Sequence, residues 1–360
     1  MADAPRVSVV MPVHNGGEYL ARAVESILGQ TLADFEFVIV NDGSTDTTAA
    51  TLQAYQARDS RVRVHDGARA GLVASLNRGC ADARAAYIAR MDADDIAFPD
   101  RLARQADFLD HHPGAAVVGS AVVRIDGGGR ELKRSISPTS HAAIVDALSA
   151  YTPFTHPSVM FRADAFVAVG RYRFAYGPAE DYDLWVRLSE RYELANLAEP
   201  LLYYRVYPGQ VSVLQLEQQM LSVVGARAAA EQRRRTGRDQ TPPDRLITRE
   251  LLREWGVADA TVAEAMAAGY RYAAYTLQES GRPREAIEVL RIGRCLSRNH
   301  AHVRQMLAGA CAKQAQAELR RGRLVDAVSL GVEALRVRPR VALELWRAAM
   351  SRALRPGAAL

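Results

Sequence analysis

The sequence predicts an α/β fold with a mostly parallel sheet flanked by helices, followed by an all-α C-terminal region. The first half alternates short β-rich runs with amphipathic helical patterns, which is typical of a parallel sheet covered by helices. From about residue 213 to 360 the pattern is almost entirely helical and rich in Ala, Leu, Glu and Arg. We therefore expect two domains, residues 1–212 and 213–360, with a linker at about residues 236–243, which contain Gly237 and two prolines.

Five segments of the first half have the pattern of strands. Residues 35–40 form an almost continuously apolar run, typical of a strand buried on both faces. Similar patterns predict strands at residues 7–11, 61–64, 87–91 and 115–123. In a parallel sheet of this kind, ligands bind outside the carboxyl ends of the strands.

Apolar residues at helical spacing predict three helices in this half. The first has its apolar face at Leu20, Ala23, Val24, Ile27 and Leu28. The second begins at Pro99 and Asp100 and has its apolar face at Leu102, Ala106 and Leu109. The third has its apolar face at Leu184, Trp185 and Leu188.

The cysteines, the N-terminal residues and the length of the apolar stretches narrow the class of protein. The three cysteines, Cys80, Cys295 and Cys311, have neither the spacing of a disulfide framework nor that of a CxxC zinc site. The N-terminal residues lack the basic segment and long apolar run of a signal peptide. No stretch approaches the ~18 apolar residues of a membrane span. We therefore expect a cytoplasmic protein.

Charge is divided unevenly along the chain. Residues 226–360 carry 25 basic and 14 acidic side chains, a net charge of +11, which leaves residues 1–225 at −6. The basic helical half would suit a protein partner or anionic lipid at the inner face of the membrane. A solvated arginine-rich surface without a partner is the alternative. No RNA- or DNA-binding motif is visible, so we expect no nucleic-acid partner.

Two segments of the helical half resemble each other at a spacing of 41 residues. Residues 279–286 and 320–327 each contain a Gly-Arg pair followed by an acidic residue and Ala. This resembles tetratricopeptide-type helical hairpins, although their usual period is about 34 residues. A plain helical bundle with two similar turns is the alternative.

An acidic turn follows the strand expected at residues 87–91. Asp92, Asp94 and Asp95 crowd into four positions there. Mg²⁺ and Mn²⁺ prefer oxygen ligands and are commonly held by one or two carboxylates together with substrate phosphates. A DxD turn at a strand end can therefore hold a cation that neutralises a leaving diphosphate. A solvated acidic turn that caps the helix after Pro99 is the alternative.

Two further acidic segments are candidates for function. Asp42 follows the strand at residues 35–40, where its carboxylate could accept a hydrogen bond from a nucleobase. Glu180 and Asp181 open a helix, where one carboxylate could act as general base toward an attacking hydroxyl. The alternatives are an ordinary strand-to-helix turn at Gly43 and an acidic helix start that the helix dipole favours.

Five ordered motifs resemble the family 2 glycosyltransferases of GT-A fold. The matching stretches are residues 7–15 (VSVVMPVHN), 40–46 (VNDGSTD), 71–77 (GLVASLN), 87–95 (YIARMDADD) and 180–185 (EDYDLW). Residues 153–162 and 205–212 are also similar to bacterial members. The resemblance covers roughly residues 6–215.

The resemblance implies roles for residues at matching positions. Contact with the nucleotide sugar is implied for Pro12, Val13, Asn15, Asp42, Asn77, Arg90 and Asp92. Asp42 would face the base and Asp92 the ribose. Asp94 would bind Mn²⁺ or Mg²⁺, and Asp95 would support the turn.

The implied activity is an inverting sugar transfer. Asp181 would deprotonate the acceptor hydroxyl, and Glu180 is the second candidate for this base. His156 and Arg205 are further candidates for the site; where the family often has a His near the diphosphate this chain has Tyr207, which would shift that contact to Arg205 or to water. The implied donor is a nucleoside diphosphate sugar, with a UDP-sugar favoured. The implied acceptor is a glycan or lipid-linked molecule in bacterial surface polysaccharide or glycoconjugate synthesis.

Other nucleotide-binding classes fit the sequence less well. A nucleotidyltransferase usually has a Gly-rich activating loop with basic residues near the N-terminus, but Gly16 and Gly17 stand beside Glu18 without a lysine. The GxxxxGK[ST] pattern of a P-loop kinase and the GxGxxG pattern of a dinucleotide-binding domain are both absent. A catalytically idle domain that binds a nucleotide sugar as a scaffold is the remaining alternative.

Overall fold

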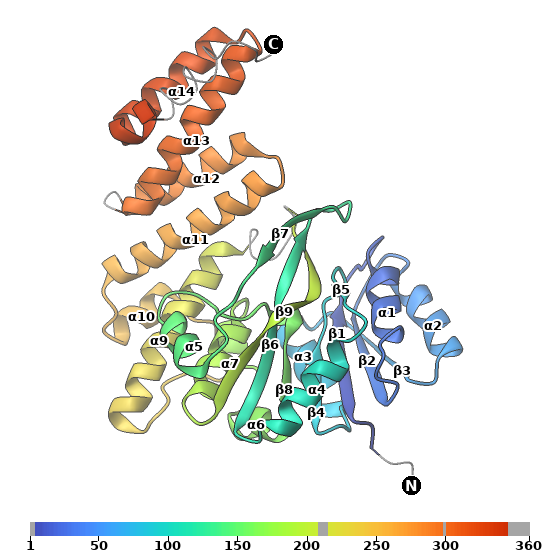
Figure 1. Ribbon diagram of the computed structural model, residues 1–360. Helices are drawn as coiled ribbons and strands as arrows, with labels where there is room; N and C mark the ends of the chain where they lie inside the picture. Colours follow the sequence, from blue (N-terminus) through green and yellow to red (C-terminus); the bar gives the residue numbers. More distant parts are fainter. Residues whose placement is uncertain (1–3, 208–214, 298–299, 345–360) are drawn as a thin grey trace. The chain divides into compact units, whose positions relative to one another are not determined.

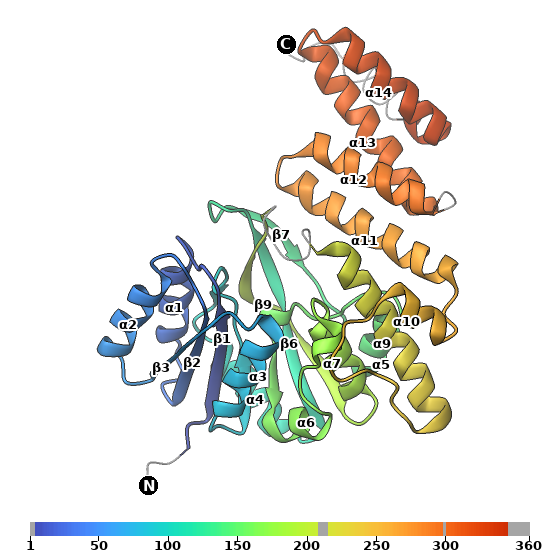
Figure 2. The same cartoon turned by 180° about the vertical axis from the view of Figure 1, so that it is seen from behind.

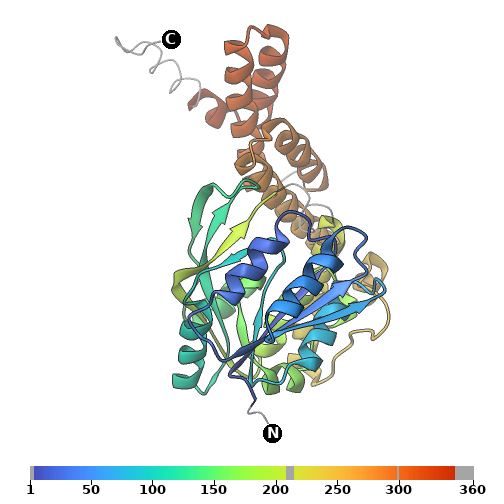
Figure 3. The same cartoon turned by 90° about the vertical axis from the view of Figure 1, so that its right-hand side faces the viewer.

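The computed structural model describes residues 4–207, 215–297 and 300–344. Contacts divide the chain into two compact units, which are residues 1–206 with 225–247 (unit 1) and residues 207–224 with 248–360 (unit 2). The domain boundary expected after residue 212 lies outside the described residues. Figures 1, 2 and 3 show each unit from three directions.

Unit 1 is built around one sheet, which has nine strands among the described residues. They are β1 (Val7–Val13), β2 (Phe35–Asp42), β3 (Val62–Gly67), β4 (Tyr87–Arg90), β5 (Ile96–Ala97), β6 (Ala115–Ile125), β7 (Glu131–Ser135), β8 (Met160–Arg162) and β9 (Glu193–Arg205). Their order is β3-β2-β1-β4-β8-β6-β9-β5, with β7 paired to β6.

The sheet is mixed rather than mostly parallel. Strands β3, β2, β1 and β4 are parallel neighbours, as the βα alternation predicts, and β6 runs parallel to β9. The other pairs, β4–β8, β6–β8, β6–β7 and β5–β9, are antiparallel. Antiparallel neighbours need no crossover helix, so the alternation of strands and helices in the sequence cannot reveal these pairs. The α/β fold class is confirmed.

Helices cover both faces of this sheet. Those of unit 1 are α1 (Leu20–Leu28), α2 (Thr48–Arg58), α3 (Leu72–Asp82), α4 (Arg101–His111), α5 (His141–Leu148), α6 (Ala163–Ala168), α7 (Glu180–Ser189) and the C-terminal part of α9 (Leu216–Thr236). α1, α2 and α4 share one core with alternate β1 side chains, such as Val9 and Met11. α3 lies on the other face, where a side-chain carbon added at Gly79 would come within 2.6 Å of Val10 (Figure 2). The apolar faces predicted for α1, α4 and α7 are buried.

Residues 225–247 return to unit 1 and pack near α7; we call this segment the C-terminal strap. It contains residues 236–243, the expected linker. The hydroxyl of Thr241 lies 2.6 Å from that of Tyr176, and the Ile247 amide donates to the Ala175 carbonyl at 3.0 Å. Ile247 itself is fully buried. The strap is therefore packed into unit 1 rather than being a free connection.

Unit 2 is all-α, as predicted. Besides the start of α9, its helices are α10 (Arg249–Glu254), α11 (Asp259–Glu279), α12 (Pro283–Leu296), α13 (Ala301–Arg320) and α14 (Leu324–Val337). α11 pairs with α12, and α13 pairs with α14. The turns contain Gly281 and Gly322 with φ of 73° and 75°, a conformation that favours glycine. The 41-residue repeat thus corresponds to two successive helical hairpins.

Candidate active site

The two acidic turns lie at the same edge of the sheet. β1 runs parallel to both β2 and β4, with Val13 opposite Asn41 and Val10 opposite Arg90. Parallel neighbours end at the same edge, so the loops after β1, β2 and β4 emerge together. Asp42 is the last residue of β2, and Asp92 lies two residues beyond β4. The prediction that the two acidic turns share one edge of the sheet is therefore confirmed.

The loop after β1 is tied to the loop after β2. Pro12 and Val13 are buried at the end of β1, whereas Asn15 is exposed and has a φ of 52°. The Asn15 amide donates to Ser44 Oγ at 2.9 Å, and the Thr45 amide donates to Asn15 Oδ1 at 2.8 Å. These reciprocal bonds hold the two loops together as one rim of the site.

Asp42 is buried and fixes a third loop. Its carboxylate accepts hydrogen bonds from the amides of Ala70 at 2.6 Å and Gly71 at 3.0 Å. Next to it lies a cavity of about 110 Å³, lined by Val40, Asn41, Asp42, Gly67, Ala68, Ala70, Ala74, Ser75 and Arg78. A carboxylate has about four acceptor positions, so these two amides leave Asp42 able to accept a further bond from a ligand in the cavity.

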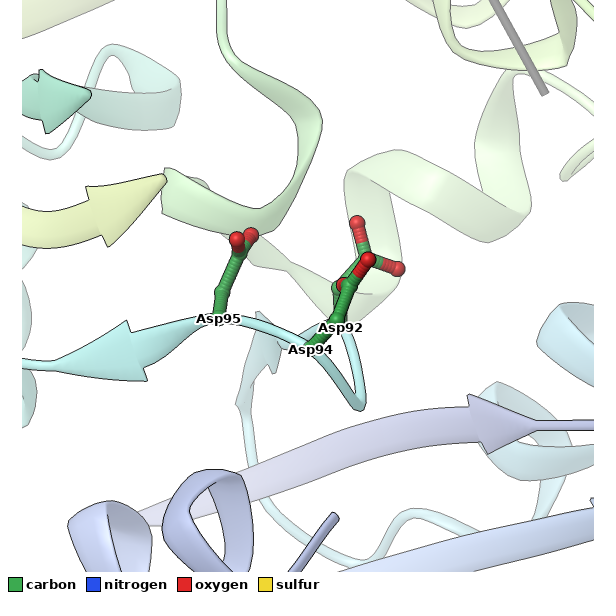
Figure 4. Close-up of side chains that lie close together, drawn as sticks. All are labelled: Asp92, Asp94 and Asp95. Carbon is green, nitrogen blue, oxygen red and sulfur yellow. The ribbon is translucent and has the colours of Figure 1, made fainter. Parts of the chain in front are cut away.

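The turn after β4 gathers three carboxylates. Asp92, Asp94 and Asp95 each offer an oxygen, and these oxygens lie within 4.8 Å of one another. Figure 4 shows the three side chains rising from one turn toward the same side. Asp95 is only 1% exposed, and its Oδ1 accepts from the Arg205 amide at 2.7 Å. Burial, reinforced by the charges of Asp94 and Asp92, holds the pKa of Asp95 well above its ordinary value.

This cluster fits a hard divalent cation. The second carboxylate oxygen of Asp95 is buried and has no hydrogen-bond partner among the described residues. An unpaired buried polar atom is costly, and crowding three carboxylates adds repulsion that a cation would relieve. The donors are all oxygen atoms, which is what Mg²⁺ and Mn²⁺ prefer.

Arg205 holds the acidic turn from within the protein. It is fully buried, and its Nε donates to the Asp94 carbonyl at 2.8 Å, while its Nη1 donates to the Asp126 and Gly127 carbonyls. Its guanidinium also lies 4.3 Å from the ring centre of Tyr19. The phosphate contact expected of Arg205 stays a prediction. Most of the matching segment, residues 208–212, lies outside the described residues.

Arg90 is a buried cation among the acidic groups. It forms an ion pair with Asp92. Burial alone would lower the pKa of Arg90, but the charge and hydrogen bond of Asp92 raise it overall, so the guanidinium stays charged. Its charge reaches Glu180, Asp181 and His156. It adds to the effect of burial in lowering the pKa of His156, and it opposes the effect of burial in raising the pKa of Glu180 and of Asp181. The acidic turn and the start of α7 therefore lie around one shared positive charge.

Burial raises the pKa of both carboxylates at the start of α7. Burial, with the charge of Asp181 added, raises the pKa of Glu180 to about 8. Glu180 is therefore mostly protonated at neutral pH and cannot take up another proton. Asp181 is half-buried, and burial raises its pKa above the ordinary value, opposed by the Tyr182 amide and Arg90. Of the pair, Asp181 is the better proton acceptor.

His156 supports this region as a neutral side chain. Burial, and then the charge of Arg90, holds the pKa of His156 well below its ordinary value. Its Nε2 lies 2.8 Å from the Tyr172 hydroxyl, and its Nδ1 lies 3.9 Å from Glu180 Oε1. Asn77 fixes the same loop, because its amide group exchanges two hydrogen bonds with the Tyr172 backbone, at 2.8 and 3.2 Å. The sequence did not single out Tyr172.

A buried ion-pair network behind α7 was also missed. Asp183 is fully buried and pairs with Arg173 and, at 2.7 Å, with Arg187. Arg173 in turn pairs with Asp239 of the C-terminal strap at 2.7 Å. The sequence shows Asp183 only as one more acid in the first turn of α7. Its spacing of four residues from Arg187 was the available signal.

Comparison with known proteins identifies the family. The family model described as "Glycosyl transferase family 2" matches residues 8–169. The O-antigen biosynthesis glycosyltransferase WbnJ of Escherichia coli is 33% identical over 205 residues, which cover 56% of this chain and 80% of WbnJ. The amylovoran biosynthesis glycosyltransferase AmsE of Erwinia amylovora is 33% identical over 205 residues, covering 55% of this chain and 75% of AmsE.

Solved structures share the fold. Residues 1–349 of S. aureus TarS, in complex with UDP-GlcNAc, superpose with a TM-score of 0.54 and 16% identity, covering 92% of this chain and 91% of that one. The mannosyltransferase PcManGT from Pyrobaculum calidifontis, in complex with GDP-Man and Mn²⁺, gives a TM-score of 0.50 and 16% identity, covering 93% and 88%. No described helix of the present chain is both long enough and apolar enough to cross a membrane. The chain belongs to the family 2 glycosyltransferases, enzymes that transfer sugars, and its α/β unit has their GT-A-like fold.

Proposed function

We propose that the chain catalyses an inverting, metal-dependent transfer of a sugar from a nucleoside diphosphate sugar to an acceptor hydroxyl. The observation that carries this proposal is the arrangement of the Asp92–Asp95 turn and the start of α7 around Arg90, at the sheet edge where Asp42 ends β2. The names of WbnJ and AmsE support an acceptor in bacterial surface polysaccharide synthesis. The ligands of TarS and PcManGT support a nucleoside diphosphate sugar as donor.

The cavity beside Asp42 is the proposed base pocket. The cavity has a volume of about 110 Å³ and would receive the base of the nucleotide. The complex of TarS with UDP-GlcNAc supports a UDP-sugar as donor. Asp42 would accept a bond from the base, with the loop of Pro12, Val13 and Asn15 beside it. Asn77 would act indirectly, through the Tyr172 loop that it fixes.

The acidic turn is the proposed diphosphate end of the site. Asp94, next to Asp92, would hold Mn²⁺ or Mg²⁺, and such an ion neutralises the charge of a departing diphosphate. Asp92, which forms an ion pair with Arg90, would contact the ribose. Asp95 accepts a hydrogen bond from the backbone amide of Arg205 and would thereby support the turn.

Asp181 is the proposed general base. Its carboxylate would take the proton of the acceptor hydroxyl while that oxygen forms a bond to the anomeric carbon. The bond between this carbon and the diphosphate oxygen breaks in the same displacement, so the configuration inverts. Glu180, whose pKa burial raises to about 8, is mostly protonated at neutral pH and would leave the role of proton acceptor to Asp181.

The test is donor turnover in a defined assay. The purified chain is incubated with UDP-sugars and Mn²⁺, with and without a cell-envelope glycan extract, and released UDP is measured. We expect release that EDTA stops and that Asp94→Asn abolishes. The control Asp164→Asn changes an exposed aspartate on α6 and should retain full activity. Full activity of Asp94→Asn in excess EDTA would remove the metal from the proposal.

A further inference from the structure

The proposed base pocket contains a second charged residue, Arg78 of α3, which the sequence did not single out. Three segments line this cavity: the end of β2, the loop after β3 and the first turns of α3. Of the described residues that line it, Asp42 and Arg78 are the two that carry a charge. The cavity therefore has a carboxylate on the side of β2 and a guanidinium on the side of α3.

Gly67 makes room for this guanidinium. It is the last residue of β3 and lies opposite Asp42 in the register of β2 and β3. A side-chain carbon added at Gly67 would lie 2.9 Å from Arg78 Nη1, closer than such carbons come to their neighbours in proteins. The φ of Gly67 is not positive, so its backbone conformation would also suit an alanine. A glycine at residue 67 therefore lets the guanidinium lie against the backbone that pairs with Asp42.

Arg78 is available to a ligand in this cavity. Its side chain is exposed, and no hydrogen bond or ion pair joins it to another of the described residues. The amide group of Asn41, which also lines the cavity, is used within the protein. It donates to Asp66 Oδ1 at 2.7 Å and accepts from the Ser44 amide at 3.3 Å. Among the charged and amide side chains of the lining, Asp42 and Arg78 therefore remain for the ligand.

A carboxylate and a guanidinium together match one kind of base edge. The carboxylate only accepts hydrogen bonds and the guanidinium only donates them. Uracil and guanine offer a ring N–H group next to a carbonyl oxygen, so each protein group finds its partner. Cytosine and adenine have the reverse pattern at these positions, a ring nitrogen without hydrogen next to an amino group. With these bases the carboxylate would face a lone pair and the guanidinium would face an N–H group.

We propose that Arg78 selects the base of the nucleotide, because it donates to the carbonyl oxygen beside the N–H group that Asp42 accepts. This inference rests on the proposed function, which puts the base in this cavity. The donor class is therefore a nucleoside diphosphate sugar whose base is uracil or guanine. A base with the reverse pattern would leave both charges without a partner, which is how a polar site rejects an analogue.

Titration calorimetry with four nucleoside diphosphates tests the proposal. UDP, GDP, CDP and ADP share the ribose and the diphosphate, so differences among their affinities for the full-length chain with Mn²⁺ report the base. The wild type should prefer UDP to CDP, or GDP to ADP, about tenfold or more. The tighter of UDP and GDP identifies the base. Arg78→Met keeps the length of the side chain without its donors, and should remove this preference while the affinities for CDP and ADP stay unchanged.

A second variant displaces the guanidinium without removing it. Gly67→Ala should reduce the same preference in the otherwise wild-type chain. It should have no further effect in Arg78→Met, because both changes act through one contact. The control Arg58→Met changes an exposed arginine of α2 that does not line the cavity, and should keep all four affinities.

The outcomes separate this inference from the proposed function. Equal losses of affinity for UDP and CDP in Arg78→Met would overturn the inference, because they would place Arg78 at the shared diphosphate. Unchanged affinities for UDP and GDP in that variant would overturn it as well. Binding of UDP that Mn²⁺ strengthens, without preference over CDP, would overturn only the role of Arg78. A wild type that binds none of the four nucleotides would contradict the proposed function itself.

Discussion

At the scale of single residues, Arg90 explains how so many acidic side chains can lie close together. Three carboxylates of the turn and two at the start of α7 lie around this one buried guanidinium. Its charge partly offsets their repulsion, and burial still keeps protons on Glu180. The surroundings of these acids differ: Asp95 is buried and hydrogen-bonded, whereas Asp181 reaches solvent.

The first prediction concerns the general base. Asp181→Asn should lower kcat by ~10²–10⁴-fold, because the amide cannot accept a proton from the acceptor. The affinity for UDP should be retained, because Asp181 lies at the acceptor side of the proposed site. Steady-state kinetics and a UDP titration measure both quantities. An unchanged kcat would move the base to Glu180 or to another residue.

The second prediction concerns stability and pH. The pKa of Glu180 is raised by burial to about 8, so the folded protein keeps a proton that the unfolded chain releases near the ordinary value of 4.5. Its contribution is complete below that ordinary value and is lost as pH rises to about 8. Glu180→Gln stays neutral, so its advantage over the wild type should grow between pH 5 and 9 by about 1 kcal/mol or more, a few degrees in Tm. Melting curves that stay parallel for the two proteins would contradict this.

Residues of the site could be predicted from the sequence where a motif puts them at the end of a strand. Asp42 and Asp94 follow parallel strands, and strand ends share an edge, so their convergence followed from the local pattern. Tyr172, Arg173 and Asp239 could not be found in this way. Each acts through a contact with a residue distant in sequence, which one sequence does not report.

At the scale of elements, the C-terminal strap holds the helix that carries the proposed base. Asp239 accepts from Arg173, which also binds Asp183 inside α7. A second contact joins Arg227 of the strap to the Tyr182 hydroxyl at 2.7 Å. Arg227 and Asp239 both lie in the strap, so the strap supports α7 through two contacts.

The third prediction tests this support. Asp239→Asn should destabilise unit 1 by ~1–2 kcal/mol, because Arg173 loses a charged partner in a half-buried site. It should also lower kcat more than it changes the KM for the donor, because the start of α7 is less firmly placed. The control Asp244→Asn lies in the same segment and is exposed, like Asp239, but within the described residues it is Asp239 that pairs with Arg173. Equal stability and kcat for the two variants would show that the strap does not position α7.

Helices and strands could be predicted where the segment is long enough for its hydrophobic periodicity to show. β1, β2, β3, β4 and β6 and helices α1, α4 and α7 were expected within a few residues of their observed bounds. β5 and β8 have two and three residues, too few for a period to show. β9 was missed because exposed residues and Pro200 interrupt its pattern, and its pairing along β6 supplies the order that its sequence does not show.

At the scale of the whole molecule, the chain forms two units, each of which is built from two separate segments of the sequence. α9 contributes its first residues to unit 2 and its later residues to unit 1. A chain that ends at residue 235 would therefore lack part of unit 1, including Asp239 and the buried Ile247.

The fourth prediction follows from this division. A chain of residues 1–248 should bind UDP as the full chain does, because it keeps the whole strap. A chain of residues 1–235 should melt at a lower temperature, since it loses the contacts of Thr241 and Ile247 with the loop before α7. Thermal melting and UDP titration of both chains distinguish them. Equal melting temperatures would show that the strap adds nothing to unit 1.

The most direct test of the central claim is calorimetric titration of UDP into the protein with Mn²⁺ and, separately, with EDTA. We predict that Mn²⁺ strengthens UDP binding at least tenfold in the wild type. In Asp94→Asn this gain should vanish while the affinity in EDTA is retained, because the base pocket beside Asp42 is untouched. Equal affinity with Mn²⁺ and with EDTA in the wild-type protein would contradict a shared site for a nucleotide and a cation at this edge of the sheet.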